Sequence, residues 1–102
     1  MNGPAADKLI VSARTAGSQL DENGISLFIV DRDADGVSLR DYSNVDGSKA
    51  SELTLENVVL PKEALLGDQD KAFSTIEEVV NLATLAISAE AIGIMQKMNE
   101  LT

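Results

Sequence analysis

A chain of 102 residues with 44% hydrophobic residues and a formal net charge of −9 suits one small folded domain and is too apolar for a disordered segment. The acidic charge disfavours binding to a phosphate backbone, and one Tyr with two Phe leaves few rings on which nucleic-acid bases could stack. The chain has no Cys and no His, which excludes disulfides, thiol nucleophiles, Ser–His catalysis and the usual zinc ligands. We expect a cytoplasmic protein.

The first half of the chain has apolar residues at about every second position, which predicts β-strands. The first two predicted strands pair antiparallel, because the Thr15–Asn23 link is too short for a helical crossover. The predicted strands cover Lys8–Arg14, Ile25–Val30, Val37–Tyr42 and Ala50–Leu60.

The loop Asp31-Arg-Asp-Ala-Asp-Gly36 matches the first half of an EF-hand calcium loop. Position 12 of that loop requires a bidentate Glu, and here it is Tyr42. The flanking segments are strand-like instead of helical. We therefore interpret the loop as a solvated turn, with a calcium site as the weaker alternative and no metal expected.

The fourth predicted strand changes parity part-way along its length. Leu53 and Leu55 face one way by alternation, whereas Val58 and Leu60 fall on the opposite parity. A bulge near Glu56-Asn57 would let both pairs face the core.

The stretch Leu53–Phe73 marks the change from a strand period to a helix period. Pro61–Leu66 is predicted as a turn closed by Gly67. A helix then begins between Asp68 and Ser74, capped by Asp68, by Asp70 or by the Ser74-Thr-Ile-Glu77 capping-box pattern, and ends near Leu101.

This helix is apolar nearly all round, so a sheet packed on one side of it leaves the other side uncovered. We therefore expect a homo-oligomer formed through the Asp70–Leu101 helix. Val79–Met95 is interrupted by polar residues, and we expect a poor membrane span and no membrane contact. Glu90, in the most apolar part, is interpreted as a partnered or partly exposed structural acid. One stripe holds Phe73, Ile76, Val80, Ala83, Ile87, Ala91, Ile94 and Met98.

Together these features predict an α+β fold, in which a small antiparallel β-sheet is followed by one long C-terminal helix. From the residues alone, the chain has no recognisable active site. The alternative to an enzyme is a non-enzymatic assembly module that self-associates through the helix.

Four ordered pieces of the sequence resemble the acyl-CoA dehydrogenase family. Asn2-Gly3, followed by Ala-Asp and an apolar strand, is similar to the region after the Trp-Ile-(Ser/Thr) flavin motif. Further pieces are Gly24-Ile-Ser-Leu-Phe-Ile-Val30 with Gly36-Val-Ser, Glu52–Pro61 with Leu65-Leu-Gly67, and Ala89-Glu-Ala-Ile-Gly-Ile-Met-Gln96 with Leu101-Thr102.

The resemblance implies FAD-dependent α,β-dehydrogenation of an acyl-CoA thioester, with a Glu as base. It implies that residues 1–67 are the second half of a β-barrel-like middle domain and residues 68–102 the first helix of the C-terminal helical domain. The catalytic Glu and most flavin contacts of the family are then outside this chain, so we expect an inactive fragment that binds no FAD. Acyl-CoA and an electron acceptor would be partners of the intact enzyme only.

Some members of the family carry the catalytic base on this helix, at the position that is Ala83 here, followed by Thr84 where Arg is common. The alternative base is therefore missing. The same resemblance assigns Asn81, Ala83 and Thr84 to the wall of the acyl-chain site.

Overall fold

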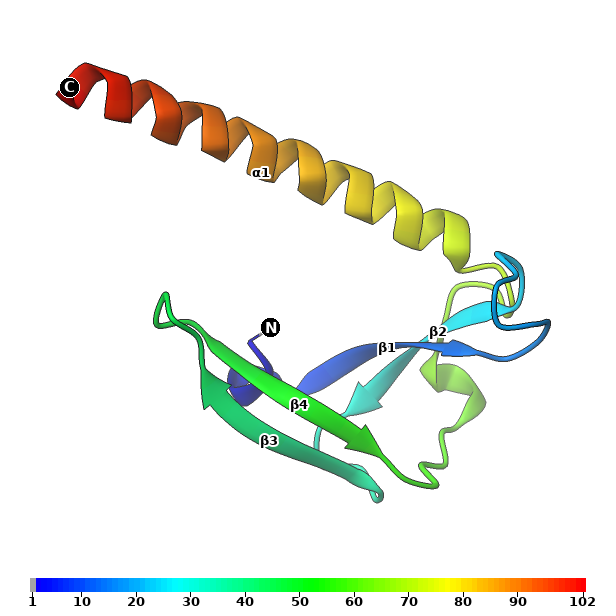
Figure 1. The fold of residues 1–102 in the computed structure, drawn as a ribbon. Coiled ribbons are helices and arrows are strands. Elements are labelled where there is room, and N and C mark those ends of the chain that lie inside the picture. The colour runs from blue at the N-terminus through cyan, green and yellow to red at the C-terminus, as the bar shows by residue number, and fades with distance from the viewer. Residues whose placement is uncertain (1) are drawn as a thin grey trace.

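The computed structural model describes residues 2–102, and its strands precede a single long helix (Figure 1). The predicted order of strands followed by a C-terminal helix is confirmed. The elements are the 3₁₀ turn η1 (Gly3–Ala5), β1 (Lys8–Arg14), β2 (Ile25–Asp31), β3 (Val37–Ser43), β4 (Lys49–Leu55), η2 (Lys62–Ala64), β5 (Leu65–Leu66) and α1 (Phe73–Leu101).

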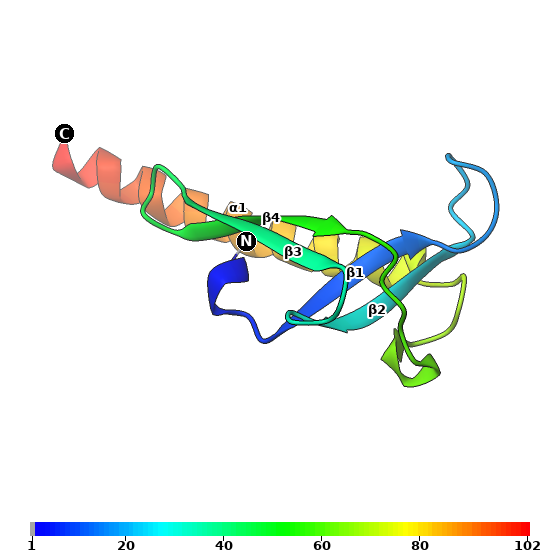
Figure 2. The same ribbon diagram turned by 90° about the horizontal axis from the view of Figure 1, so that it is seen from below.

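The strands form two small antiparallel sheets. β1 pairs with β2 along its whole length, from Lys8↔Asp31 to Arg14↔Ile25, as predicted from the short link. The two-residue β5 adds to the other edge of β2, so the first sheet has the order β1-β2-β5. β3 and β4 form a separate hairpin, which lies beside β1 in both views (Figures 1 and 2).

β4 ends earlier than predicted, at Leu55 instead of Leu60. The chain leaves the sheet where a bulge was expected, because Asn57 adopts a left-handed conformation with φ of 53°. This turn shifts the alternation of inward-facing and outward-facing side chains by one residue, as the apolar pattern required. Val58 and Leu60 return to the same apolar hollow as Leu55.

The loop Asp31–Gly36 forms the turn between β2 and β3. Asp31 forms a salt bridge with Lys8 across the β1–β2 ladder. Within residues 2–102 no three acidic side chains are gathered closely enough to hold a metal ion.

The buried core is small. Its fully buried side chains are Val30 and Ser26, with Ala50, Ala64 and Ala72 also buried. Small side chains at these positions let the strands approach η2 and the start of α1 closely. The core therefore stabilises the sheet body and the start of the helix, and the rest of the helix lies outside it.

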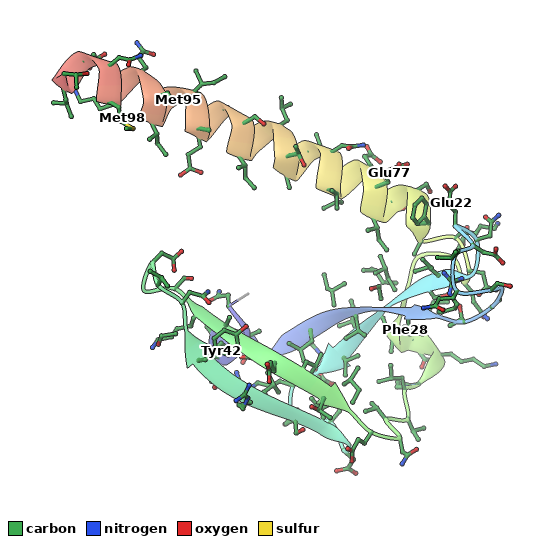
Figure 3. The ribbon with its side chains drawn as sticks, viewed as in Figure 1. Glu22, Phe28, Tyr42, Glu77, Met95 and Met98 are labelled. Atoms are coloured by element: carbon green, nitrogen blue, oxygen red, sulfur yellow. The ribbon has the colours of Figure 1, made fainter. Side chains whose placement is uncertain are left out.

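After its first turn α1 runs beside the sheets without packing on them, and none of its residues is buried (Figure 1). Only Phe73 and Ile76, in its first turn, are half-buried. The expectation that the sheet covers one side of the helix is therefore wrong. Figure 3 shows Met95 and Met98 at the far end of α1, where they are 55% and 63% exposed.

The extended helix makes the chain larger than a compact domain. Its radius of gyration is 17.6 Å, against about 13 Å for a globular chain of this length. Its accessible surface is 8,097 Å², against roughly 5,500 Å² for a compact monomer of this mass. About 2,500 Å² of additional surface is thus exposed.

By length and composition, α1 is also apolar enough to cross a membrane, with a mean hydropathy of 1.5 over its best 18-residue window. The expectation of a poor membrane span rested on the polar residues within Val79–Met95, and it stays a prediction. The same test is also met by core helices of soluble proteins.

Candidate functional site

The joint between β2 and α1 is the most closely hydrogen-bonded part of the molecule. Ser26 is completely buried, and its Oγ accepts a hydrogen bond from the backbone N–H of Asp70 at 2.8 Å. The Thr15 hydroxyl lies 2.6 Å from the same Oγ and donates to the Asp70 carboxylate. Backbone hydrogen bonds from Gly24 N–H to Asp70 O and from Ala72 N–H to Ile25 O, both 2.9 Å, complete the joint.

This joint replaces the helix cap that the sequence predicted. The N-cap residue of α1 is Ala72, which has no side-chain cap, and Ser74 lies inside the first turn. Asp70 has a left-handed φ of 65° and directs its carboxylate to Thr15. The predicted caps at Asp68, Asp70 and Ser74 are therefore wrong, because tertiary hydrogen bonds to β2 fix the start of the helix.

Arg14 organises the link that lies beside this joint. Its guanidinium donates to the carbonyl oxygens of Ala16, Gln19, Asp21 and Asn23 over distances of 2.8–3.2 Å. A guanidinium carries five N–H donors in a fixed planar arrangement, so one side chain can bind several carbonyl oxygens at once. The link carries Glu22 to the first turn of α1, where Glu22, Asn23, Lys71, Phe73 and Ser74 line an open hollow of about 300 Å³ (Figure 3).

The three residues predicted to face an acyl chain lie on the third and fourth turns of α1, and all are exposed. With 3.6 residues per turn, Asn81 and Thr84 lie roughly 60° apart on one face, whereas Ala83 is roughly 160° from Asn81. The Thr84 hydroxyl donates to Val80 O at 2.8 Å within the helix. Their role in a substrate wall stays a prediction.

The most apolar hollow lies between the two sheets and has a volume of about 460 Å³. No charged side chain lines it, and Asn57 supplies its polar side chain. Such a surface can pack against an apolar group but offers no acid or base. Its lining residues are Val11, Ala13, Phe28, Val30, Leu55, Asn57, Val58 and Leu60.

These hollows do not fit a flavin, which needs several buried hydrogen-bond donors around its ring and phosphates. The apolar hollow has few polar groups, and the hollow at the start of α1 is open to solvent and smaller, at about 300 Å³. Glu90 is exposed on α1, and no salt bridge to it occurs within residues 2–102. We derive no catalytic step from these residues.

No known family model matches the sequence. Individual relatives do match it. A cyclohexane-1-carbonyl-CoA dehydrogenase of Geobacter metallireducens is 38% identical over 98 residues, which is 93% of this chain and 25% of that protein. A 3-(aryl)acrylate reductase of Clostridium sporogenes is 35% identical over 96 residues, which is 91% of this chain and 25% of the reductase.

A solved structure from Mycobacterium abscessus, described as a probable acyl-CoA dehydrogenase, has the same fold over this region. It superposes with a TM-score of 0.69 and 26% identity over 76% of this chain and 21% of that one. The chain is homologous to one segment of the acyl-CoA dehydrogenases. It spans about a quarter of the length of the curated relatives it matches.

The predicted resemblance to acyl-CoA dehydrogenases is thereby confirmed, and it extends over the sheets and most or all of α1. Sequence reasoning missed Ser26 and Arg14, which set the link and the helix in place. The available signal for Ser26 was a lone hydroxyl at the start of an otherwise apolar strand, where a buried polar group needs partners. Arg14 carried no comparable signal, since an Arg at a strand end is usually solvated.

Proposed function

We propose that this chain supplies part of an acyl-CoA dehydrogenase and has no activity alone. The observation that carries the proposal is the match over more than nine-tenths of this chain to about a quarter of each relative. In this proposal, residues 1–67 belong to the middle β-domain and residues 68–102 open the C-terminal helical domain. The complete enzyme would bind FAD and an acyl-CoA thioester largely through residues outside this chain.

The chemistry of the described residues supports inactivity. The position that carries a base in some members is Ala83, whose methyl group cannot accept a proton. The two hollows described above hold no buried set of donors for a flavin. The test is flavin absorbance of the purified chain, together with acyl-CoA oxidation using an artificial electron acceptor. Stoichiometric FAD with turnover would contradict the proposal.

The exposed polar pair Asn81 and Thr84 is proposed as part of the acyl-chain wall. Ala83, roughly 160° from Asn81, would line it from the other side of the helix. A chimera in which this chain replaces the matched segment of the Geobacter relative would test this. Asn81→Leu should change KM and the preference among acyl-CoA chain lengths. Asn99→Leu, five turns further along the same helix face, is the matched control and should leave both unchanged.

A second candidate function is self-association through α1. It is favoured by the exposure of α1 beyond its first turn and by the additional 2,500 Å² or so of accessible surface. Light scattering or sedimentation at micromolar concentration tests it directly. A stable monomer would contradict it.

A further inference from the structure

The exposed helix carries a surface that we call the α1 stripe, and its composition is symmetric about one residue. Ile87 stands at the centre. Ala83 and Ala91 lie four residues to either side of it, Val80 and Ile94 seven, Ile76 and Met98 eleven, and Phe73 and Leu101 fourteen.

The α1 stripe is fully apolar and largely accessible. Ile87 is 66% exposed, Val80 55% and Ile94 54%. Glu77 and Lys97 lie on opposite flanks, each roughly 80° from the centre of the stripe, and Glu90 is roughly 60° from it. The stripe reaches roughly 40° to either side of its centre, so these charged residues flank it, and its accessible part runs from Val80 to Leu101 because Phe73 and Ile76 are half-buried.

We propose that the α1 stripe binds the same stripe of a second copy, in an antiparallel pair centred on Ile87. This inference rests on the proposed self-association and specifies its geometry. In a two-fold pair each residue meets its counterpart on the other side of the centre. Large residues then meet large residues, and Ala83 meets Ala91 on both sides of Ile87, where the small side chains allow the two backbones to approach.

The available area is sufficient for such a pair. A stable interface buries about 800 Å² on each partner, and this chain exposes about 2,500 Å² more than a compact monomer. α1 is 29 residues long, so the contact could run for roughly 43 Å.

The direction of the pair follows from the symmetry of the α1 stripe about Ile87. The chain is 56 Å long and α1 alone is roughly 43 Å, so the sheet body lies beside much of the helix (Figures 1 and 2).

Two substitutions on opposite faces of α1 test which face forms the contact between the two copies. Ile87→Asp places two carboxylates at the centre of the pair and should weaken dimerisation about tenfold or more. Leu85→Asp is the matched control, because Leu85 is 68% exposed and lies roughly 160° round the helix from Ile87. Leu85→Asp should leave the dimer intact.

Cysteine cross-linking tests the direction and the register, and the lack of native Cys makes each single substitution unambiguous. Under oxidation, Ile87→Cys should form a disulfide dimer. A mixture of the Val80→Cys and Ile94→Cys variants should form a mixed dimer, whereas neither should cross-link with itself. Two Val80 positions would be roughly 21 Å apart along the pair, too far for a disulfide.

The outcomes separate this inference from the self-association on which it rests. A chain that is monomeric in solution overturns both, and leaves the stripe for a lipid surface or another polypeptide. A dimer in which Val80→Cys and Ile94→Cys each cross-link with themselves, or which Leu85→Asp weakens as much as Ile87→Asp, overturns the antiparallel stripe alone. The predicted pattern of cross-links with selective loss through Ile87→Asp establishes it.

Discussion

The substitution Ser26→Ala should separate the start of α1 from the sheet body. The Ser26 side chain is fully buried, and its Oγ is the acceptor for the Asp70 N–H at 2.8 Å and a partner of the Thr15 hydroxyl at 2.6 Å. Alanine leaves the Asp70 N–H without this acceptor, and a buried donor without a partner costs about 1–3 kcal/mol. The Thr15 hydroxyl keeps the Asp70 carboxylate as a partner.

We therefore expect Ser26→Ala to lower the free energy of unfolding by about 2 kcal/mol. For a domain of this size the melting temperature would fall by roughly 10 °C. Urea and thermal unfolding followed by circular dichroism measure both quantities. The control is Ser12→Ala, which removes the same atom from an exposed position of β1 and should have little effect.

The network predicts a further, more specific result. Thr15→Val removes the hydroxyl that joins Ser26 to Asp70, so its cost should be smaller in the Ser26→Ala background than in the wild-type chain. If Ser26→Ala changes the free energy of unfolding by less than about 0.5 kcal/mol, or if the two substitutions are additive, the joint does not stabilise the fold as argued.

Three other predictions concern the loops. Arg14→Lys should loosen the 15–23 link and speed its cleavage by protease, because one ammonium cannot reach four carbonyl oxygens as the guanidinium fork does, while Arg40→Lys should not. Gly36→Ala should destabilise the chain more than Gly47→Ala in urea unfolding. Both glycines have positive φ, but a Cβ at Gly36 would lie 2.1 Å from the backbone oxygen of Glu56, whereas a Cβ at Gly47 would meet nothing within 4 Å. Hydrogen bonds from Ser48 hold the pKa of the Asp46 carboxyl below its ordinary 3.8, so its stabilisation of the β3–β4 turn is complete above pH 3.8 and is lost as the pH falls through the lowered value. The protection of the Ser48 amide, which is its exchange rate relative to the intrinsic rate at the same pH, should therefore fall in acid in the wild-type chain and already be low at neutral pH in Asp46→Ala. Protection in the wild type that does not change with pH would contradict this assignment.

The candidate site is explained only in part by the sequence. Asn81, Ala83 and Thr84 were assigned by resemblance, and the structure places Asn81 and Thr84 on one face and Ala83 away from Asn81. The residues that fix the helix are Ser26 and Thr15. The sequence could mark Ser26 as a hydroxyl in need of a partner but could not name that partner, because Asp70 is 44 or more residues away from both.

The sequence by itself determined the elements of this protein and its resemblance to one family. Alternation defined β1, β2 and β3 to within a residue, since a half-buried strand needs an apolar residue at every second position. The 3.6-residue period defined α1, and ordered motifs indicated the acyl-CoA dehydrogenases. Only the tertiary structure decided how the elements meet: two sheets instead of one, a helix start fixed by β2 instead of by a cap, and a helix that the sheets do not cover. The physical reason is that local patterns state which face of an element is apolar, whereas the surface that covers this face depends on contacts between distant residues.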